Sequence, residues 1–170
     1  FTFLGAKGGV GCTTAAVNTA LALQISHGDV VLVDFAHGHT ALQLNLRPRF
    51  CVLDALRNLD RMDASLLVGY ISKTTEGLHL LAGPTQPEAN ESTPGELARL
   101  LGFLVNHYRF VIIDGSSRMD RTTKLLSDLS EAVLVVAQTD VLSLWCAGRI
   151  QSFLEEGARR DRIQLVLNRY

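Results

Sequence analysis

The chain alternates short, continuously apolar runs with longer stretches in which apolar residues recur at helical spacing. Six apolar runs are rich in Val, Ile or Leu and lack polar alternation, which is typical of strands buried on both faces. These runs are Phe1–Leu4, Val30–Val33, Leu78–Ala82, Phe110–Ile113, Ala132–Ala137 and Ile163–Leu167. The stretches between them predict five helices, at Thr13–Ser26, Leu53–Tyr70, Gly95–His107, Met119–Ser130 and Ser143–Gly157.

This order of elements defines the expected fold class. Strands that alternate with helices require right-handed crossovers and give a mainly parallel sheet with helices on both faces, a doubly wound α/β fold. The segment Gly83–Thr93 contains two prolines and several polar residues, and it predicts a long loop. We expect residues 1–170 to form a single domain. Because the chain begins at Phe1, inside an apolar run and without Met, we expect this domain to be part of a longer protein.

Composition narrows the classes of function. The sequence is 47% hydrophobic and 19% charged with a net charge of −1, which is ordinary for a globular domain and argues against strong nucleic-acid binding. The three cysteines are widely spaced and form no CxxC pair, so neither a zinc site nor a disulfide framework is predicted. We therefore expect a reducing, cytoplasmic setting.

Three polar features follow predicted strands directly. They are a glycine-rich loop after the first strand, Asp34 after the second and Asp114 after the fourth. In open α/β sheets, ligands bind beyond the carboxyl ends of the strands. The sequence therefore predicts that these features meet at one ligand site.

The glycine-rich loop runs from Gly5 to Thr14 and joins a strand to a helix. Glycines allow backbone N–H groups to approach a phosphate closely, and the positive end of the following helix adds attraction. We expect the phosphate contacts to come from Lys7, Gly8, Gly9, Val10, Gly11, Cys12, Thr13 and Thr14. Compared with the Walker pattern, Cys12 stands where the lysine is expected, whereas Thr13 keeps the hydroxyl that ligates Mg²⁺.

Asp34 and Asp114 complete the predicted metal site. A carboxylate at the end of an apolar strand, on the phosphate side, suits Mg²⁺ held directly or through water. We therefore predict Thr13, Asp34 and Asp114 as the Mg²⁺ ligands, with ATP as the nucleotide. The alternative for either acid is a helix cap or a turn former.

The segment Lys7–Thr14 reads KGGVGCTT and resembles the deviant Walker motif KGGVGKTT of the MinD/ParA ATPase superfamily, with one departure. The resemblance implies a nucleotide-linked homodimer in which Lys7 reaches the phosphates of the partner as a catalytic residue. It also implies that Asp34 is the first, catalytic acid of the Asp-x-Asp segment, that Asp114 is the Walker B acid and that Asn168 contacts adenine. The second acid of Asp-x-Asp is Ala36 here.

Both departures fall on the hydrolytic machinery. A cation about 4 Å from a phosphate oxygen contributes on the order of 4 kcal/mol in a partly screened site, and much of phosphoryl-transfer catalysis is charge stabilisation of this kind. With Cys12 in place of the lysine and Ala36 in place of an acid, we expect nucleotide binding with weak or no hydrolysis.

Four stretches are similar to the CpaE/TadZ branch of pilus-assembly proteins: LNLRPRFCVLDALRNLDRMDASLL, GLHLLAGPTQPE, YRFVIIDGSSRMD and LVLNRY. This resemblance implies a localisation or assembly switch for tight-adherence pilus or secretion machinery, with pilus-assembly proteins as partners. It implies a cytoplasmic location, at a cell pole or peripheral to the inner membrane. Membrane-targeting helices of MinD-type proteins lie beyond a position such as Tyr170, so the chain makes no prediction of membrane contact.

Two other functions remain open from the sequence. Cys12 and Ala36 also fit a scaffold that uses the fold without nucleotide. The spacing Gly5-x-x-x-Gly9-x-Gly11, with Asp34 as a ribose ligand, fits a short-chain NAD-binding oxidoreductase. The Tyr-x-x-x-Lys pair of such enzymes is absent, since Tyr70 and Lys73 are one residue too close.

The sequence also predicts the surroundings of Cys12 and of three apolar residues near the C-terminal end of the chain. Cys12 at a helix N-terminus is either a reactive thiol with a depressed pKa or, as we favour, a small uncharged filler. We expect Leu142, Leu144 and Trp145 to pack their helix against the sheet or a dimer partner, with a surface patch as the lesser alternative.

Overall fold

The computed structural model describes residues 1–36, 38–86, 92–115, 117–155 and 160–169. Its strands are β1 (Thr2–Gly5), β2 (Val30–Asp34), β3 (Ser72–Lys73), β4 (His79–Leu81), β5 (Phe110–Asp114), β6 (Val133–Ala137) and β7 (Ile163–Leu167). Its α-helices are α1 (Cys12–His27), α2 (His39–Gln43), α3 (Val52–Arg57), α4 (Ala64–Tyr70), α5 (Pro94–Val105), α6 (Arg121–Asp128) and α7 (Val141–Glu155). Two short 3₁₀ helices are η1 (Leu59–Arg61) and η2 (Arg160–Arg162).

The strands form one seven-stranded sheet in the order β3-β4-β2-β5-β1-β6-β7. Every pair of neighbours is parallel except β3 and β4, which are antiparallel. The predicted doubly wound, mainly parallel α/β fold is confirmed. The six apolar runs of the sequence are its six parallel strands.

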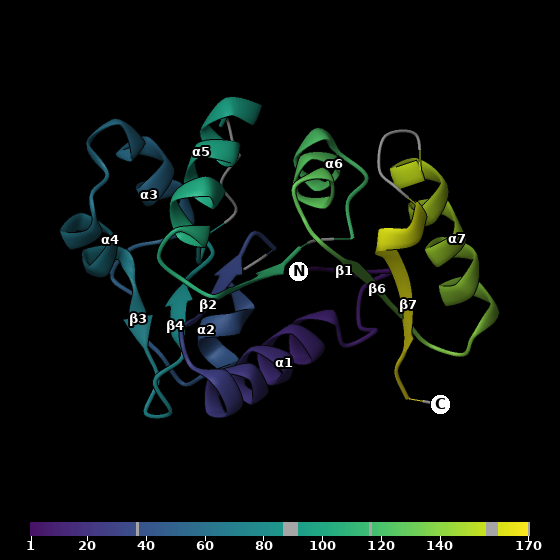
Figure 1. Ribbon diagram of the computed structural model, residues 1–170. Helices are drawn as coiled ribbons and strands as arrows, with labels where there is room; N and C mark the ends of the chain where they lie inside the picture. The colour runs from purple at the N-terminus through teal and green to yellow at the C-terminus, as the bar shows by residue number, and fades with distance from the viewer. Residues whose placement is uncertain (37, 87–91, 116, 156–159, 170) are drawn as a thin grey trace.

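Helices cover both faces of the sheet, as Figure 1 shows with α1 and α2 below and α5 and α6 above. Alternate residues of the central strands enter different cores: Val31 and Val33 of β2 pack on the side of α3 to α6, whereas Val30 and Leu32 pack on the side of α1. All four are buried. This two-sided burial explains why the strands read as continuous apolar runs rather than alternating ones.

The strand order creates a switch point at β1. The chain leaves β1 for α1 and β2 on one side, and later passes from β5 to β6 across it, so β1 lies between β5 and β6. The register places Asp34 opposite Asp114 on β2 and β5, and Phe3 of β1 opposite Asp114. The carboxyl ends of β1, β2 and β5 therefore meet, where ligands bind in folds of this type.

Three details of the sequence prediction are wrong. The single helix expected over Leu53–Tyr70 is α3, η1 and α4, because Asn58 ends α3 outside helical geometry and the Asp63 side chain caps a new helix by accepting a 2.7 Å bond from the Leu66 N–H. The five-residue α2 was not predicted. Neither was β3, which is two residues long and therefore too short to give a periodic signal.

Among the described residues, no helix combines the length and the apolar character needed to cross a membrane.

Candidate nucleotide-phosphate site

The loop between β1 and α1 has the backbone geometry of a phosphate cradle. Gly9 and Gly11 have φ values of 80° and 90°, which residues with a Cβ rarely adopt. At Gly11 a Cβ would also collide with the carboxamide of Asn168. These two positions require glycine, so the composition of the loop follows from its shape.

The first turn of α1 is open to an anion. Gly11 is the N-cap, no side chain caps the helix, and its first turn holds no acidic residue. The N–H groups at this end therefore lack intrahelical acceptors and side-chain acceptors. A 16-residue helix adds the positive end of its dipole at the same place.

Two carboxamides hold the outer side of the loop. The Asn168 Nδ2 donates to the Val10 carbonyl at 2.8 Å, and the Gln138 Nε2 donates to the Gly9 carbonyl at 3.3 Å. The backbone N–H of Asn168 is fixed in turn by the Ala137 carbonyl at 2.8 Å. These contacts fix the Gly9 and Val10 carbonyls toward the ends of β6 and β7. Asn168 was predicted as an adenine contact, a role that stays a prediction.

Gln138 was missed by the sequence reasoning. It follows the apolar run of β6 directly, in the same way that Asp34 and Asp114 end their strands. Polar residues at the carboxyl ends of all the parallel strands, and not only acidic ones, were the signal that would have found it.

Asp114 is the most unusual group of the site. Its side chain is 1% exposed, and its Oδ2 has no hydrogen-bond partner. The Cys12 thiol donates to the Oδ1 over 3.6 Å. Burial, opposed by Thr13 and Cys12 and aided by the nearby charge of Asp34, raises the pKa of Asp114 to about 7. A buried, unpaired carboxylate oxygen is costly.

The orphaned oxygen of Asp114 fits a divalent cation. Mg²⁺ prefers oxygen ligands and is held by one or two carboxylates together with substrate phosphates. Asp114 Oδ2 offers such an oxygen, and Thr13, in the first turn of α1, is the neighbour of Cys12, whose thiol contacts the same carboxylate. The donor set suits the predicted Mg²⁺.

Both carboxylate oxygens of Asp34 already accept hydrogen bonds from the protein. Its Oδ1 accepts from the Ala36 N–H at 2.8 Å, and its Oδ2 accepts from the Thr40 hydroxyl at 2.7 Å and the Thr40 N–H at 3.3 Å. The carboxylate is fully buried beside Asp114 and fixes the start of α2 against β2. Its predicted roles in catalysis and in holding Mg²⁺ stay predictions. Thr40 was missed because the short α2 was not predicted.

Lys7 lies on the exposed side of the loop. Its ammonium is 3.5 Å from Asp140 Oδ2, and the two side chains are 29% and 45% exposed. The other oxygen of Asp140 accepts from the Ser143 N–H at 2.8 Å at the start of α7. Ion pairs exposed to this degree contribute only a few tenths of a kcal/mol to about 1 kcal/mol, so Lys7 can leave Asp140 at little cost.

Cys12 is not an activated thiol. Burial raises its pKa strongly, and the charge of Asp114 and the hydrogen bond to that residue add to the rise. The alternative of a depressed pKa is therefore wrong, and the uncharged filler is the better description. The reason is that Cys12 faces a buried carboxylate, which disfavours a thiolate more than the helix end favours it.

The loop, the helix end and the two strand-end acids define a P-loop nucleotide-binding domain of the MinD/ParA type. The family model described as "Cellulose biosynthesis protein BcsQ" matches residues 1–170, and the chain belongs to this family. The narrower resemblance to the CpaE/TadZ branch stays a proposal.

Known proteins support the wider superfamily. The septum site-determining protein MinD of Thermotoga maritima is 25% identical over 169 residues, 96% of this chain and 61% of that protein. A putative MinD of Tupiella akineta is 29% identical over 96% of this chain and 54% of that protein. The crystal structure of a ParA family ATPase from Chlorobium tepidum superposes with a TM-score of 0.85 at 26% identity and covers 99% of this chain and 73% of that one.

The chain spans about three-fifths of the length of the first of these curated relatives and about half of the second. The family assignment does not favour the oxidoreductase alternative. The structure adds a physical reason, since both oxygens of Asp34 are bonded within the protein rather than directed at a ribose.

Proposed function

We propose that this domain is an ATP- and Mg²⁺-binding switch whose nucleotide-bound form pairs with a second copy, and that it hydrolyses ATP weakly or not at all. The observation that carries the proposal is the unpartnered Oδ2 of Asp114 beside the uncapped N-terminus of α1. The carboxylate oxygen favours a bound cation, and the helix N-terminus favours a bound anion. Mg²⁺ bound to a triphosphate supplies both.

The pairing step rests on Lys7. Its weak ion pair with Asp140 leaves the ammonium at the surface of the loop, able to reach phosphates bound on a second copy, as the resemblance to MinD/ParA proteins implies. The ATPase named in the Chlorobium tepidum structure supports a nucleotide as the ligand.

Weak hydrolysis follows from the two residues that are missing. Cys12 provides a thiol where a cation would stabilise the charge that develops on the transferred phosphoryl group. Ala36 provides no carboxylate to position a water molecule. The cradle survives both changes because it is made of backbone N–H groups.

We also propose the cellular process in which this switch acts. The resemblance to CpaE/TadZ proteins supports tight-adherence pilus or secretion assembly, with a cytoplasmic location at a pole or at the inner membrane. The family description supports cellulose biosynthesis. Pili and cellulose are both made at the cell surface. We propose that the domain helps to localise or assemble machinery of this kind.

The test is calorimetric titration of the domain with ATP and Mg²⁺, together with light scattering to measure mass. We expect binding that needs Mg²⁺ and a doubling of mass with ATP. Asp114→Asn should abolish the Mg²⁺ dependence, and Lys7→Ala should abolish pairing while leaving binding. Lys73→Ala, a lysine of β3, is the matched control and should change neither.

Two results would replace the proposal. A mass that is dimeric with or without ATP and is unchanged by Lys7→Ala would favour the nucleotide-independent scaffold, which Cys12 and Ala36 motivate. Thermal protection by NAD, in place of ATP, would favour the oxidoreductase.

A further inference from the structure

The carboxylate of Asp34 lies at the end of β2 and is closed off from solvent. Asp34 is 0% exposed, as is Thr40 on the following helix. Gly83, two residues after β4, covers the carboxylate so closely that a Cβ at that position would lie 2.8 Å from the Asp34 Cγ. A cation could therefore contact Asp34 only if the backbone at Gly83 moved away.

Asp34 also holds the start of α2. The N-cap of α2 is Gly38, which has no side chain that could accept a hydrogen bond. The Thr40 N–H, in the first turn, donates instead to Asp34 Oδ2 at 3.3 Å, and the Thr40 hydroxyl donates to the same oxygen at 2.7 Å. An isolated helix as short as the five residues of α2 is not stable in water. The position of α2 therefore depends on these bonds.

The short helix in turn packs against α1, whose N-terminus forms the phosphate site. Ala41 of α2 belongs to the same buried cluster as Val17 of α1. The Gln43 Nε2 of α2 also donates to the Thr14 hydroxyl, in the first turn of α1, at 3.5 Å. A displacement of α2 would therefore remove support from the first turns of α1.

The two strand-end acids differ in whether an oxygen is left for a cation. Both oxygens of Asp34 accept hydrogen bonds from N–H or O–H groups, whereas the Asp114 Oδ2 has no partner among the described residues. Hydrogen bonds to a carboxylate are charge-assisted and therefore strong. A cation at Asp34 would have to displace them, whereas a cation at Asp114 would meet an oxygen that the protein leaves open.

We propose that Asp34 is a positioning residue, which holds α2 against the start of α1 through Thr40, and that Asp114 is the only one of the two acids that contacts Mg²⁺. This role takes the place of the catalytic and metal-binding roles that the sequence predicts for Asp34. The part that concerns Mg²⁺ rests on the proposed nucleotide switch. The part that concerns α2 does not, and it can be measured without nucleotide.

Amide hydrogen exchange of the ligand-free domain tests the hold on α2. The Leu44 N–H donates to the Thr40 carbonyl at the end of α2, so its exchange reports opening of this helix. Thr40→Val keeps the shape of the side chain but removes the hydroxyl, and it should speed this exchange about tenfold. Asp34→Asn should do the same. Thr40→Ser keeps the hydroxyl and should exchange as the wild type does.

Gly83→Ala is an independent variant, because it leaves every donor and acceptor in place. Its Cβ would collide with the Asp34 carboxylate, so it should also speed exchange of the Leu44 N–H. The matched control is Gly102→Ala on α5, where a Cβ would meet nothing within 4 Å. This control should leave the exchange of α2 unchanged.

Titration of ATP binding with Mg²⁺ separates positioning from ligation. Asp34→Asn and Thr40→Val should weaken ATP binding several-fold at saturating Mg²⁺, because α1 loses support. The Mg²⁺ concentration that gives half-maximal binding should stay within about twofold of the wild type in both variants. Asp114→Asn should instead abolish the dependence on Mg²⁺.

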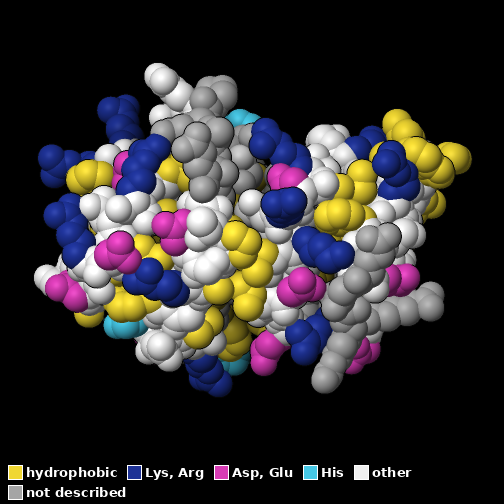
Figure 2. Space-filling model, turned by 90° about the horizontal axis from the view of Figure 1, so that it is seen from above, with side chains coloured by type: hydrophobic (Ala, Val, Ile, Leu, Met, Phe, Trp, Pro, Cys, Tyr) yellow, Lys and Arg dark blue, Asp and Glu magenta, His cyan; other side chains and the backbone are white. Residues whose placement is uncertain are grey.

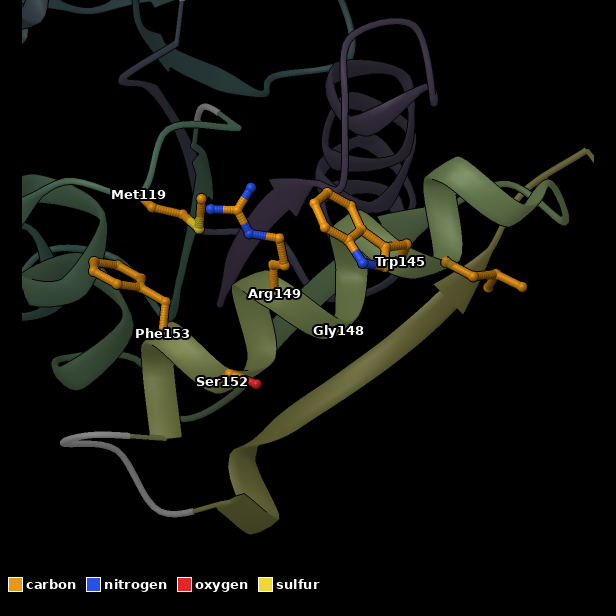
Figure 3. A pocket seen from close by; sticks show the side chains of 7 residues that line it. Met119, Trp145, Gly148, Arg149, Ser152 and Phe153 are labelled. Atoms are coloured by element: carbon orange, nitrogen blue, oxygen red, sulfur yellow. The ribbon is translucent and has the colours of Figure 1, made fainter.

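The outer side of α7 is a surface remote from Asp34. The helix packs on β6, and two strands lie between β6 and β2. A groove of about 660 Å³ runs along it, in which the Arg149 side chain lies between Met119 and Trp145 (Figure 3). Hydrophobic side chains gather at this end of the molecule with Lys and Arg beside them (Figure 2). Leu142, Leu144 and Trp145 are 58%, 44% and 59% exposed, so the expectation that they pack against the sheet is wrong.

This surface provides a control for disturbance of the whole fold. Trp145 is the single tryptophan of the chain, so its fluorescence reports on α7 alone. Its emission should be the same in the wild type, Thr40→Val, Asp34→Asn and Gly83→Ala. A shift in these variants would mean that the whole domain is disturbed and would overturn the local role of Asp34.

Two further results would overturn the proposal. Exchange of the Leu44 N–H at the wild-type rate in Thr40→Val would show that Asp34 does not hold α2 through this residue. A large rise in the Mg²⁺ requirement of Asp34→Asn, with no such rise in Thr40→Val, would make Asp34 a ligand. A domain that binds no ATP would remove the proposed switch, while the exchange rates would still decide whether Asp34 positions α2.

Discussion

At the scale of the residue, the position of Cys12 decides how the site uses its charges. In place of a lysine, the thiol donates weakly to a carboxylate that is buried and half satisfied. The carboxylates of Asp34 and Asp114 therefore have no lysine ammonium beside them at position 12. Nucleotide-bound Mg²⁺ has to provide that positive charge, which makes the cation more important here than in a loop with the lysine.

Restoring the lysine tests this view. Cys12→Lys should strengthen ATP binding about tenfold or more, since an ammonium near phosphate and carboxylate oxygens gains roughly 1.5–3 kcal/mol through charge-assisted hydrogen bonds. Hydrolysis should rise only modestly because Ala36 remains. Calorimetry and phosphate release measure the two quantities, and Cys12→Met is the uncharged control. A large gain in rate would show that Ala36 is not limiting.

The carboxamide of Asn168 supports a second prediction. Asn168→Ala removes the donor to the Val10 carbonyl, so the loop should become more mobile and bind phosphate several-fold more weakly. If Asn168 acts through the loop, affinity for tripolyphosphate falls as much as affinity for ATP. If it contacts adenine, only the affinity for ATP falls. Asn106→Ala, at the end of α5, is the control.

At the scale of the element, sequence patterns predicted the parallel strands well. The central strands, such as β1, β2 and β6, are buried on both faces, so their runs are almost wholly apolar and polar residues mark their ends, whereas the edge strand β7 is mostly exposed. The prediction failed where an element is too short for a period, as in α2 and β3, and where one apolar stripe continues across a break. Leu53, Leu56 and Leu59 keep helical spacing from α3 into η1, so only the cap at Asp63 reveals a new helix.

That cap gives an element-scale prediction. Asp63→Ala should reduce the free energy of unfolding by about 1 kcal/mol, which lowers the melting temperature by roughly 2–4 °C, because the Leu66 N–H loses its acceptor. Asp60→Ala is the matched control, since the Asp60 side chain is in an exposed ion pair with Arg99, and such pairs contribute little to stability. Equal losses in the two variants, measured by thermal unfolding, would contradict the capping role.

The contact between β4 and the segment before β5 carries a pH dependence. His79 Nδ1 is 2.8 Å from the Tyr108 hydroxyl, and burial, aided by Lys73, lowers the pKa of His79. The unfolded chain therefore binds a proton below about pH 6.5 while the folded chain resists it. Stability should be complete above that pH and fall as the solution is acidified. His79→Gln should flatten this fall in chemical unfolding between pH 7 and 5, whereas His107→Gln should not.

At the scale of the whole molecule, the sheet has one open apolar edge among the described residues. β7 pairs with β6 alone, and Leu165 and Leu167 of β7 are 53% and 45% exposed. Exposed apolar edges promote association between chains. Leu165→Lys should therefore reduce concentration-dependent aggregation in light scattering with little change in melting temperature, whereas Gln164→Lys, on the same strand, should have a smaller effect.

The candidate site shows what a sequence can and cannot predict at this scale. The loop and the strand-end acids were predicted because each carries a local signal and the parallel sheet brings such ends together. The bonds of Asp34 to Thr40, of Cys12 to Asp114 and of Gln138 to the loop depend on side-chain directions after folding, which spacing does not reveal.

The amide that holds Val10 belongs to Asn168, 158 positions later in the chain. During synthesis, the loop is therefore made well before the residue that holds it. A growing chain that still lacks β7 therefore has the glycines but not their support, and it should capture phosphate poorly. Ribosome-bound chains should therefore bind nucleotide weakly until β7 and Asn168 have emerged and the loop has its support.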